Sequence, residues 1–117
     1  MAGTTAAPAD AVADWGERNM GDKQTLIDFV AWSKANYPAK RYALFFGGHG
    51  WSWHPGYVMR DDTGAAPDAL DYLEVQAALP SLGAVDMVAY DACNMASLEI
   101  QHLWAGKATS FAASQEV

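Results

Sequence analysis

The first strong pattern along the chain is helical. Apolar side chains recur at spacings of three and four across residues 23–36, which is typical of a helix with one buried face. Asp22 stands where an N-terminal cap is expected. The helix is expected to end at Tyr37, because Pro38 pushes the residue before it out of helical space. The apolar face comprises Leu26, Phe29, Val30 and, at its margin, Ala31 and Trp32.

Three later segments are short and apolar rather than periodic. Residues 41–46 and 85–90 are nearly continuous apolar runs, which predict strands buried on both faces of a sheet. Residues 109–113 predict a third strand. A continuous apolar run has no periodicity that distinguishes a strand from a helix. The assignment of these segments as strands therefore depends on their length and on the turn residues beside them.

Two further helices are predicted between these strands. Asp71 and Glu74 have the spacing of a capping box, with Asp in the place of Ser or Thr. They predict a short helix that runs through Leu79 and is closed by Pro80. Residues 95–105 predict another helix. The alternation of helices and strands predicts an α/β fold, in which right-handed crossovers join parallel strands and helices cover both faces of the sheet.

The region between residues 47 and 69 is predicted to be irregular. It contains Trp51 and Trp53, and a turn is expected at residues 61–64. A loop of this length inside a compact domain is usually functional. Two interpretations of the tryptophans stay open: they line a cleft, or they only pack the loop.

Candidate chemistry lies at the carboxyl ends of two predicted strands. Gly47-Gly48-His49-Gly50 follows the first, and Asp91-Ala92-Cys93-Asn94-Met95 follows the second. In a parallel sheet such ends share one rim, where ligands bind. A thiolate is a strong nucleophile, and an imidazole can carry the proton of a leaving group. Cys93 and His49 are therefore candidate catalytic residues.

Two local features favour this chemistry. The helix predicted just after Cys93 places a positive dipole end near the sulfur, which favours the thiolate. Gly50 carries no side chain over its N–H, so this group and the N–H of Cys93 can donate to an oxyanion. The competing interpretation makes Cys93 a small buried hydrophobic residue and His49 a structural residue in a glycine turn.

Composition narrows the range of partners. The 117 residues suffice for one domain, with residues 1–13 as a loose Ala-rich lead-in and residues 14–117 as the domain. A net charge of -7 argues against nucleic acid and against an anionic membrane surface. The single cysteine excludes an internal disulfide and a Cys-rich zinc site. No apolar stretch approaches the roughly 20 residues of a membrane span, and no signal peptide is visible.

The two motifs also match a known family. Residues 36–44 and 47–50, then 91–99, then 113–116, resemble the clostripain family of cysteine peptidases in order and spacing. The resemblance runs from about residue 20 to the end of the chain. These peptidases belong to the caspase-like clan, with legumain, gingipain and separase. The resemblance implies a caspase-like, mostly parallel sheet with helices on both faces, incomplete here with about three core strands.

The resemblance also assigns roles to residues. It implies that His49 is the catalytic histidine, which protonates the leaving amine, and that Cys93 is the nucleophile. The N–H groups of Gly50 and Cys93 are then the oxyanion donors. Clostripain-like enzymes prefer Arg, or sometimes Lys, before the cleaved bond. Asp91 is the positional candidate for the carboxylate that pairs with this side chain, and Glu116 is a weaker one. The alternative for Asp91 is a strand-end residue that never touches substrate.

Further properties follow only from the resemblance. The chemistry requires no cofactor, but members bind Ca²⁺ in some cases, and Asp61 and Asp62 offer oxygen ligands of the right kind. A plain turn is the alternative for this pair. Arg60 is the only Lys or Arg between His49 and Cys93, so it is the candidate for self-cleavage. The family is largely bacterial and often exported, which favours a secreted or extracytoplasmic protein.

The sequence therefore predicts a cysteine endopeptidase domain that hydrolyses peptide bonds after Arg or Lys. Its expected partner is a peptide or protein substrate with a basic residue before the scissile bond. Two alternatives stay open. One is a non-catalytic caspase-like fragment or pseudoenzyme that binds peptide or a partner chain, since family members extend further at both ends. The other is an unrelated α/β domain in which Cys93 is a core residue.

Overall fold

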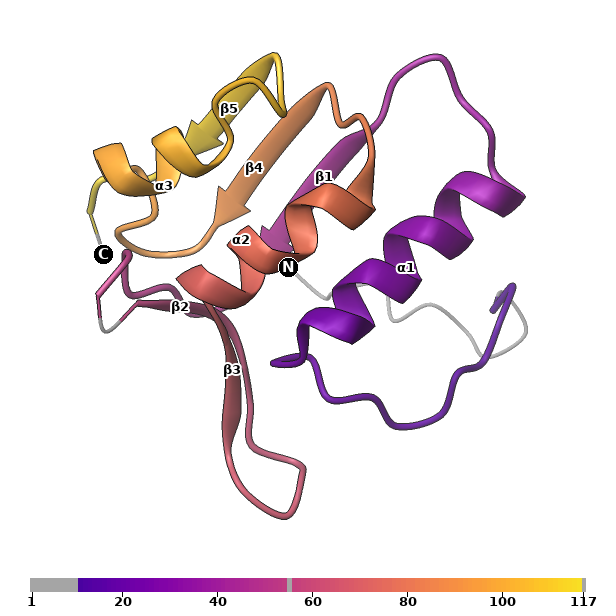
Figure 1. The fold of residues 1–117 in the computed structure, drawn as a ribbon. Helices are drawn as coiled ribbons and strands as arrows, with labels where there is room; N and C mark the ends of the chain where they lie inside the picture. The colour runs from indigo at the N-terminus through magenta and orange to yellow at the C-terminus, as the bar shows by residue number, and fades with distance from the viewer. Residues whose placement is uncertain (1–10, 55, 117) are drawn as a thin grey trace, which may run out of the picture.

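The computed structural model describes residues 11–54 and 56–116, which contain three helices and five strands (Figure 1). Residues 1–10 of the predicted lead-in lie outside the described residues. Three parallel strands form a sheet in the order β1-β4-β5, and β2 and β3 form an antiparallel hairpin. In chain order the elements are α1 (Lys23–Asn36), β1 (Ala43–Gly47), β2 (Tyr57–Asp61), β3 (Asp68–Asp71), α2 (Tyr72–Leu82), β4 (Met87–Asp91), α3 (Leu98–Leu103) and β5 (Ser110–Ala113).

The predicted caps of the first two helices are confirmed. The Asp22 carboxylate accepts a hydrogen bond from the backbone N–H of Gln24 at the start of α1. Asp71 accepts from the N–H of Glu74 at 2.8 Å, and the Glu74 carboxylate accepts from the N–H of Asp71 at 3.2 Å. Each cap satisfies backbone donors that the helix itself leaves without a partner.

The prediction that Pro80 closes the second helix is wrong, because α2 continues to Leu82. Leu82 is 2% exposed, so the last turn buries apolar surface against the core. The Lys34 ammonium of α1 donates to the carbonyl oxygens of Leu82 and Ala84, at 2.7 and 2.5 Å. A side chain of another helix thus provides a donor for carbonyl oxygens at the C-terminal end of α2. One missing N–H at Pro80 is a small loss beside this burial and capping.

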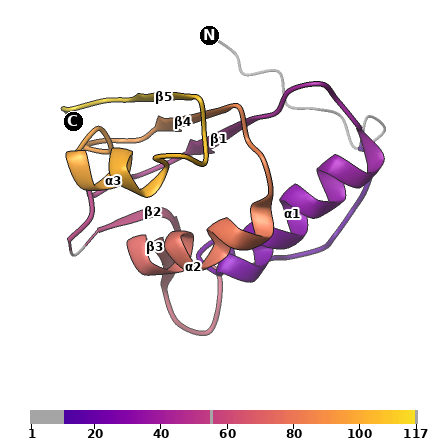
Figure 2. The same cartoon turned by 45° about the horizontal axis from the view of Figure 1, so that its top comes forward.

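The parallel sheet with flanking helices is confirmed, but α1, α2 and α3 all lie on the same side of it (Figure 2). Exposure along β1 alternates accordingly, with Leu44 and Phe46 buried and Phe45 65% exposed. The expectations of helices on both faces and of β1 buried on both faces are therefore wrong for the described chain. The central strand β4 does bury three consecutive residues, Val88 to Tyr90, as its sequence predicted.

The core lies between the sheet and the helices. The Phe46 and Tyr90 rings stack with their centroids 4.7 Å apart. Trp104 follows α3, and its indole N–H donates to the Tyr90 hydroxyl at 2.8 Å, so the buried polar ends of both side chains are paired. These contacts come from β1, β4 and the segment after α3, and they fix the carboxyl ends of the two strands relative to each other.

The expectation of an irregular region between residues 47 and 69 is also wrong in part, because it contains β2 and the first half of β3. A bulge interrupts their pairing between Val58 and Arg60, where Met59 has a φ of 60°. The predicted turn at residues 61–64 does lie at the tip of this hairpin. Within the described residues, no helix has the length and the apolar character needed to cross a bilayer.

Candidate active site

The register of the sheet brings the two predicted motifs to one rim. Gly47, the last residue of β1, pairs with Asp91, the last residue of β4. The Gly48 N–H extends this pairing with a 3.1 Å hydrogen bond to the Asp91 carbonyl oxygen. His49 and Cys93 each lie two residues beyond the paired positions. The predicted shared rim at the carboxyl ends of the strands is therefore present.

Gly50 brings the backbones of the two motifs into direct contact. A Cβ atom placed on Gly50 would lie 2.6 Å from the Cys93 carbonyl oxygen and 2.9 Å from the Ala92 Cβ. Real Cβ atoms do not approach other atoms this closely, so only glycine fits at this position. The close approach places the turn that carries His49 against the turn that carries Cys93.

The two candidate catalytic side chains differ in exposure. His49 is exposed, while Cys93 is half-buried in the turn that follows β4. Cys93 is thus neither on a strand nor sealed in the core, in contrast to the competing interpretation from the sequence. Among the described residues no hydrogen bond joins its sulfur to the His49 ring.

The helix expected directly after Cys93 begins later than predicted. Residues 93–96 form turns, and α3 starts at Leu98, with Ser97 as its cap. The reason lies in a distant contact, because the Ala96 N–H donates to the Ser114 carbonyl oxygen at 2.9 Å. The argument from a helix dipole at the sulfur therefore fails, since dipole effects fade beyond the first turn of a helix.

Two backbone N–H groups of the motifs have no backbone hydrogen-bond partner among the described residues. Trp51 donates its N–H to the Tyr57 carbonyl oxygen at 3.0 Å, but among the described residues the N–H groups of Gly50 and Cys93 make no such bond. Gly50 is buried. Buried N–H groups without an acceptor are rare in proteins, and a pair of them at one site can bind an oxyanion.

The two acidic candidates lie in different settings. Asp91 is exposed at the end of β4, and within the described chain neither a hydrogen bond nor an ion pair engages its carboxylate. Its side chain points to the sheet face opposite the helices, since side chains alternate along a strand and Tyr90 lies in the core. Glu116 is held by its backbone, where its carbonyl oxygen accepts from the Asn94 N–H at 3.3 Å.

A cavity of about 530 Å³ opens beside the rim, and the sequence prediction missed most of it. Of the two tryptophans considered from the sequence, Trp51 lines this cavity and Trp53 does not. Most of the other lining residues are polar, and they come from three segments that no sequence motif connects. The lining includes Ser52, His54, Asn94, Ser97 and Gln115.

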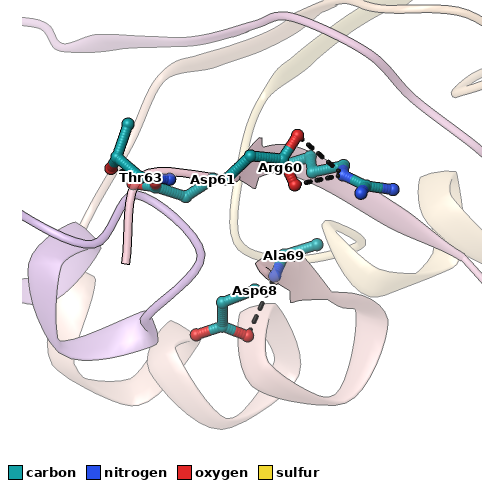
Figure 3. A network of polar contacts seen from close by, with 6 residues as sticks. Arg60, Asp61, Thr63, Asp68 and Ala69 are labelled. Carbon is teal, nitrogen blue, oxygen red and sulfur yellow. Dashed lines mark hydrogen bonds and ion pairs between the residues drawn. The ribbon is translucent and has the colours of Figure 1, made fainter. Parts of the chain in front are cut away.

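The acidic pair considered for calcium is used within the hairpin instead. Asp61 is 8% exposed and accepts hydrogen bonds from the N–H groups of Met20 and Thr63 and from the Thr63 hydroxyl. These bonds hold the pKa of the Asp61 carboxyl below its usual value, and the bond from the Thr63 hydroxyl contributes most. Asp62 pairs with Arg60 at 2.8 Å (Figure 3). This pair therefore does not fit a calcium site.

Other candidate positions can also be placed. Arg60, considered for self-cleavage, lies on β2 with an exposed side chain. In the described part of the chain, no group of three or more His, Cys, Asp or Glu side chains is arranged to hold a metal ion. Calcium binding and self-cleavage stay predictions from the resemblance.

Comparison with known proteins finds the family that the sequence motifs resemble. The sequence profile of the clostripain family matches residues 9–117. Clostripain from Hathewaya histolytica is 31% identical over 100 residues, which cover 74% of this chain. A secreted C11 cysteine protease from Bacteroides thetaiotaomicron, solved with an irreversible peptide inhibitor, matches 87% of this chain with a TM-score of 0.76 at 24% identity.

The match covers only part of each relative. The chain spans 18% of the length of clostripain and 30% of the length of the Bacteroides protease. The structural likeness establishes the fold, and it confirms the caspase-like α/β architecture expected from the sequence.

Proposed function

This chain belongs to the clostripain family of cysteine peptidases, and from that premise we propose that it hydrolyses peptide bonds after Arg or Lys with Cys93 and His49. The contact of Gly50 with the turn of Cys93 carries this proposal, since it draws the two motifs together at one rim. The half-buried thiol supports it, because a nucleophile needs access to its substrate.

The proposed reaction has two steps. The Cys93 sulfur gives up its proton to His49 and attacks the carbonyl carbon, which forms a C–S bond and places negative charge on the carbonyl oxygen. The N–H groups of Gly50 and Cys93 hold this oxygen. The C–N bond then breaks, and His49 gives its proton to the leaving amine.

The second step returns the enzyme to its starting state. His49 takes a proton from water, whose oxygen attacks the thioester carbon. A C–O bond forms and the C–S bond breaks, which releases the carboxylic acid and the Cys93 sulfur, to which the proton returns. Every group required for both steps belongs to the rim described above.

Asp91 supplies the proposed preference for a basic residue. Its carboxylate is exposed at the end of β4, beside the turn of Cys93, and no described residue pairs with it. A guanidinium group pairs with a carboxylate through two parallel hydrogen bonds, which favours Arg over Lys.

A fluorogenic peptide that ends in Arg tests the proposal, with and without Ca²⁺. We expect turnover by the wild-type chain, and a loss of 10³-fold or more in both Cys93→Ala and His49→Ala. His102→Ala is the matched control, because His102 is exposed on α3 and lies outside the rim. Full turnover in Cys93→Ala contradicts the proposal.

The same assay separates the alternatives. No turnover, combined with labelling of Cys93 by an Arg-containing affinity reagent, indicates a chain that binds peptide without cleaving it. A Cys93 thiol that resists labelling in the folded protein indicates a structural residue.

A further inference from the structure

The cavity beside the rim is built from three separate segments. Trp51, Ser52 and His54 come from the loop after His49, while Asn94 and Ser97 come from the turn after Cys93. Gln115 closes it from the segment after β5. The volume of about 530 Å³ lies within the range of roughly 300 to 1,000 Å³ that is usual for small-ligand sites.

The wall formed by the loop after His49 is held in place by its backbone. The Trp51 N–H donates to the Tyr57 carbonyl oxygen at 3.0 Å, and Gly50 pairs with Val58 in an isolated bridge. Gly56 packs so closely that a Cβ atom there would lie 2.2 Å from the Ser52 carbonyl oxygen. The Trp51 side chain therefore extends from an anchored backbone.

The opposite wall is held by the segment after β5. The Ala96 N–H donates to the Ser114 carbonyl oxygen at 2.9 Å, and the Asn94 N–H donates to the Glu116 carbonyl oxygen at 3.3 Å. These bonds fix the residues on either side of Gln115. The side chain of Gln115 is thereby placed in the cavity, next to the turn that carries Cys93.

The Asp91 side chain and part of the cavity lining lie towards opposite faces of the sheet. Asp91 points to the face without helices, whereas the lining residue Ser97 caps α3 on the other face. A peptide whose Arg side chain pairs with Asp91 therefore continues past Cys93 towards the cavity. The loop that follows His49 forms one wall, and His49 is the residue that delivers the proton to the leaving amine. The proposed role of His49, together with the loop wall that follows it, therefore assigns the cavity to the side of the leaving group.

The chemistry of the lining limits what it can bind. None of the lining residues is Asp, Glu, Lys or Arg, so a charged side chain would lose water without gaining an ionic partner. Trp51 is 56% exposed and offers an aromatic surface. The hydroxyl and amide groups of Ser52, Asn94 and Gln115 can bond to the peptide backbone around the inserted side chain.

We propose that this cavity binds the side chain of the residue that follows the cleaved bond, and that it selects a large uncharged side chain, aromatic foremost. The inference rests on the proposed function for the position of the peptide. Trp51 is the specificity-determining residue, because its indole is the largest side chain that lines the cavity and is 56% exposed.

Binding to the Cys93→Ala variant tests the inference without requiring turnover. Three labelled peptides differ only after Arg, with Phe, Gly or Asp at that position, and fluorescence anisotropy gives their dissociation constants. We expect the Arg-Phe peptide to bind about tenfold more tightly than the Arg-Gly peptide and more tightly still than the Arg-Asp peptide. Adding Trp51→Ala should reduce the preference for Phe over Gly to less than about threefold.

Two further variants guard against an indirect effect. Trp53→Ala is the matched control, because Trp53 is 47% exposed on the same loop but does not line the cavity, and it should keep the preference. Gln115→Trp fills the cavity from the opposite wall and should abolish the preference while Trp51 stays intact. Equal or undetectable binding of all three peptides overturns the inference, as does a Trp53→Ala variant that loses the preference like Trp51→Ala.

Turnover by the wild-type chain distinguishes this inference from the proposed function. Cleavage of all three peptides at equal rates, with no binding preference, overturns the inference and supports the peptidase. A binding preference that depends on Trp51, without cleavage of any peptide, overturns the peptidase and supports the cavity as a site for the residue after Arg.

Discussion

The rim and the hairpin each contain an aspartate at the end of a strand, and the two residues are used in opposite ways. Asp61 ends β2 and is buried, with its carboxylate engaged by Met20 and Thr63. Asp91 ends β4 and is exposed, and within the described residues no donor engages its carboxylate. The same residue type at the same position of a strand thus serves the structure in one region and is available to a ligand in the other.

The difference extends to how each region is held together. The polar side chains of the hairpin are engaged in hydrogen bonds. Asn19 donates to Asp68, and Thr63 donates to Glu17, so the segment before α1 is tied to the hairpin. The rim is held by the pairing of the strands, the close approach at Gly50 and the buried aromatic side chains beneath it, and the described residues engage neither the Asp91 carboxylate nor the Cys93 thiol. A region fixed by its backbone leaves its side chains available for chemistry.

The largest effect is expected from Gly50→Ala. The added methyl group would lie 2.6 Å from the Cys93 carbonyl oxygen and 2.8 Å from the Met95 side chain, so the two turns of the rim must separate. We expect kcat/KM to fall by about 10² or more, since small displacements of catalytic groups cost this much. Steady-state assay of an Arg peptide measures the change.

Gly21→Ala is the matched substitution on the hairpin side. A Cβ atom there would lie 2.6 Å from the Ala69 backbone nitrogen, so the variant should lower the urea midpoint of unfolding. The folded fraction should keep its turnover. If Gly21→Ala loses turnover under conditions in which it is fully folded, the hairpin and the rim are not independent.

The second effect concerns Asp91→Asn, which removes the charge and keeps the size. We expect kcat/KM for Arg peptides to fall by about 10²-fold, because the paired guanidinium loses its carboxylate. The urea midpoint should stay within error of the wild type, since no described residue depends on this carboxylate. Unchanged preference for Arg over an uncharged residue would assign Asp91 to the structure.

Asp61→Asn should show the reverse pattern. An amide can accept hydrogen bonds at only one of the two positions where the carboxylate accepts them from Met20 and Thr63. We therefore expect a lower urea midpoint, with the preference for Arg unchanged in the folded protein. Equal midpoints for variant and wild type would show that these contacts add nothing to stability.

The smallest effect is the pH dependence of the difference in urea midpoint between the wild type and Asp61→Asn. The hydrogen bonds lower the pKa of Asp61 in the folded state, so the ionised form contributes stability. This contribution is fully present above the unfolded pKa of about 3.9 and is lost as the pH falls through the lower folded value. Urea midpoints of wild type and Asp61→Asn should differ by a constant amount from pH 5 to 7 and converge below about pH 4.

Features that depend on neighbouring residues could be predicted from the sequence. The caps at Asp22 and Asp71 act on donors two or three residues away, so the local sequence contains the whole interaction. The shared rim of His49 and Cys93 also followed, because alternating helices and strands imply parallel pairing and a common end.

Features that depend on distant partners could not be predicted. The helix after Cys93 starts late because Ala96 bonds to Ser114, and α2 continues past Pro80 because Lys34 satisfies its end. The cavity joins three segments, and Gln115 enters it through contacts of its neighbours with the turn after Cys93. In each case the deciding partner is more than fifteen residues away, and no local pattern marks it.

The register in which Gly47 meets Asp91 limits how the length of this chain can vary during evolution. One residue inserted within β1 or β4 would shift the turn of His49 relative to the turn of Cys93 and move the imidazole away from the sulfur. An insertion at the tip of the hairpin, between residues 62 and 67, would lengthen an exposed loop at little cost. Gains and losses of residues among related genes should therefore accumulate at that tip and spare the two strands.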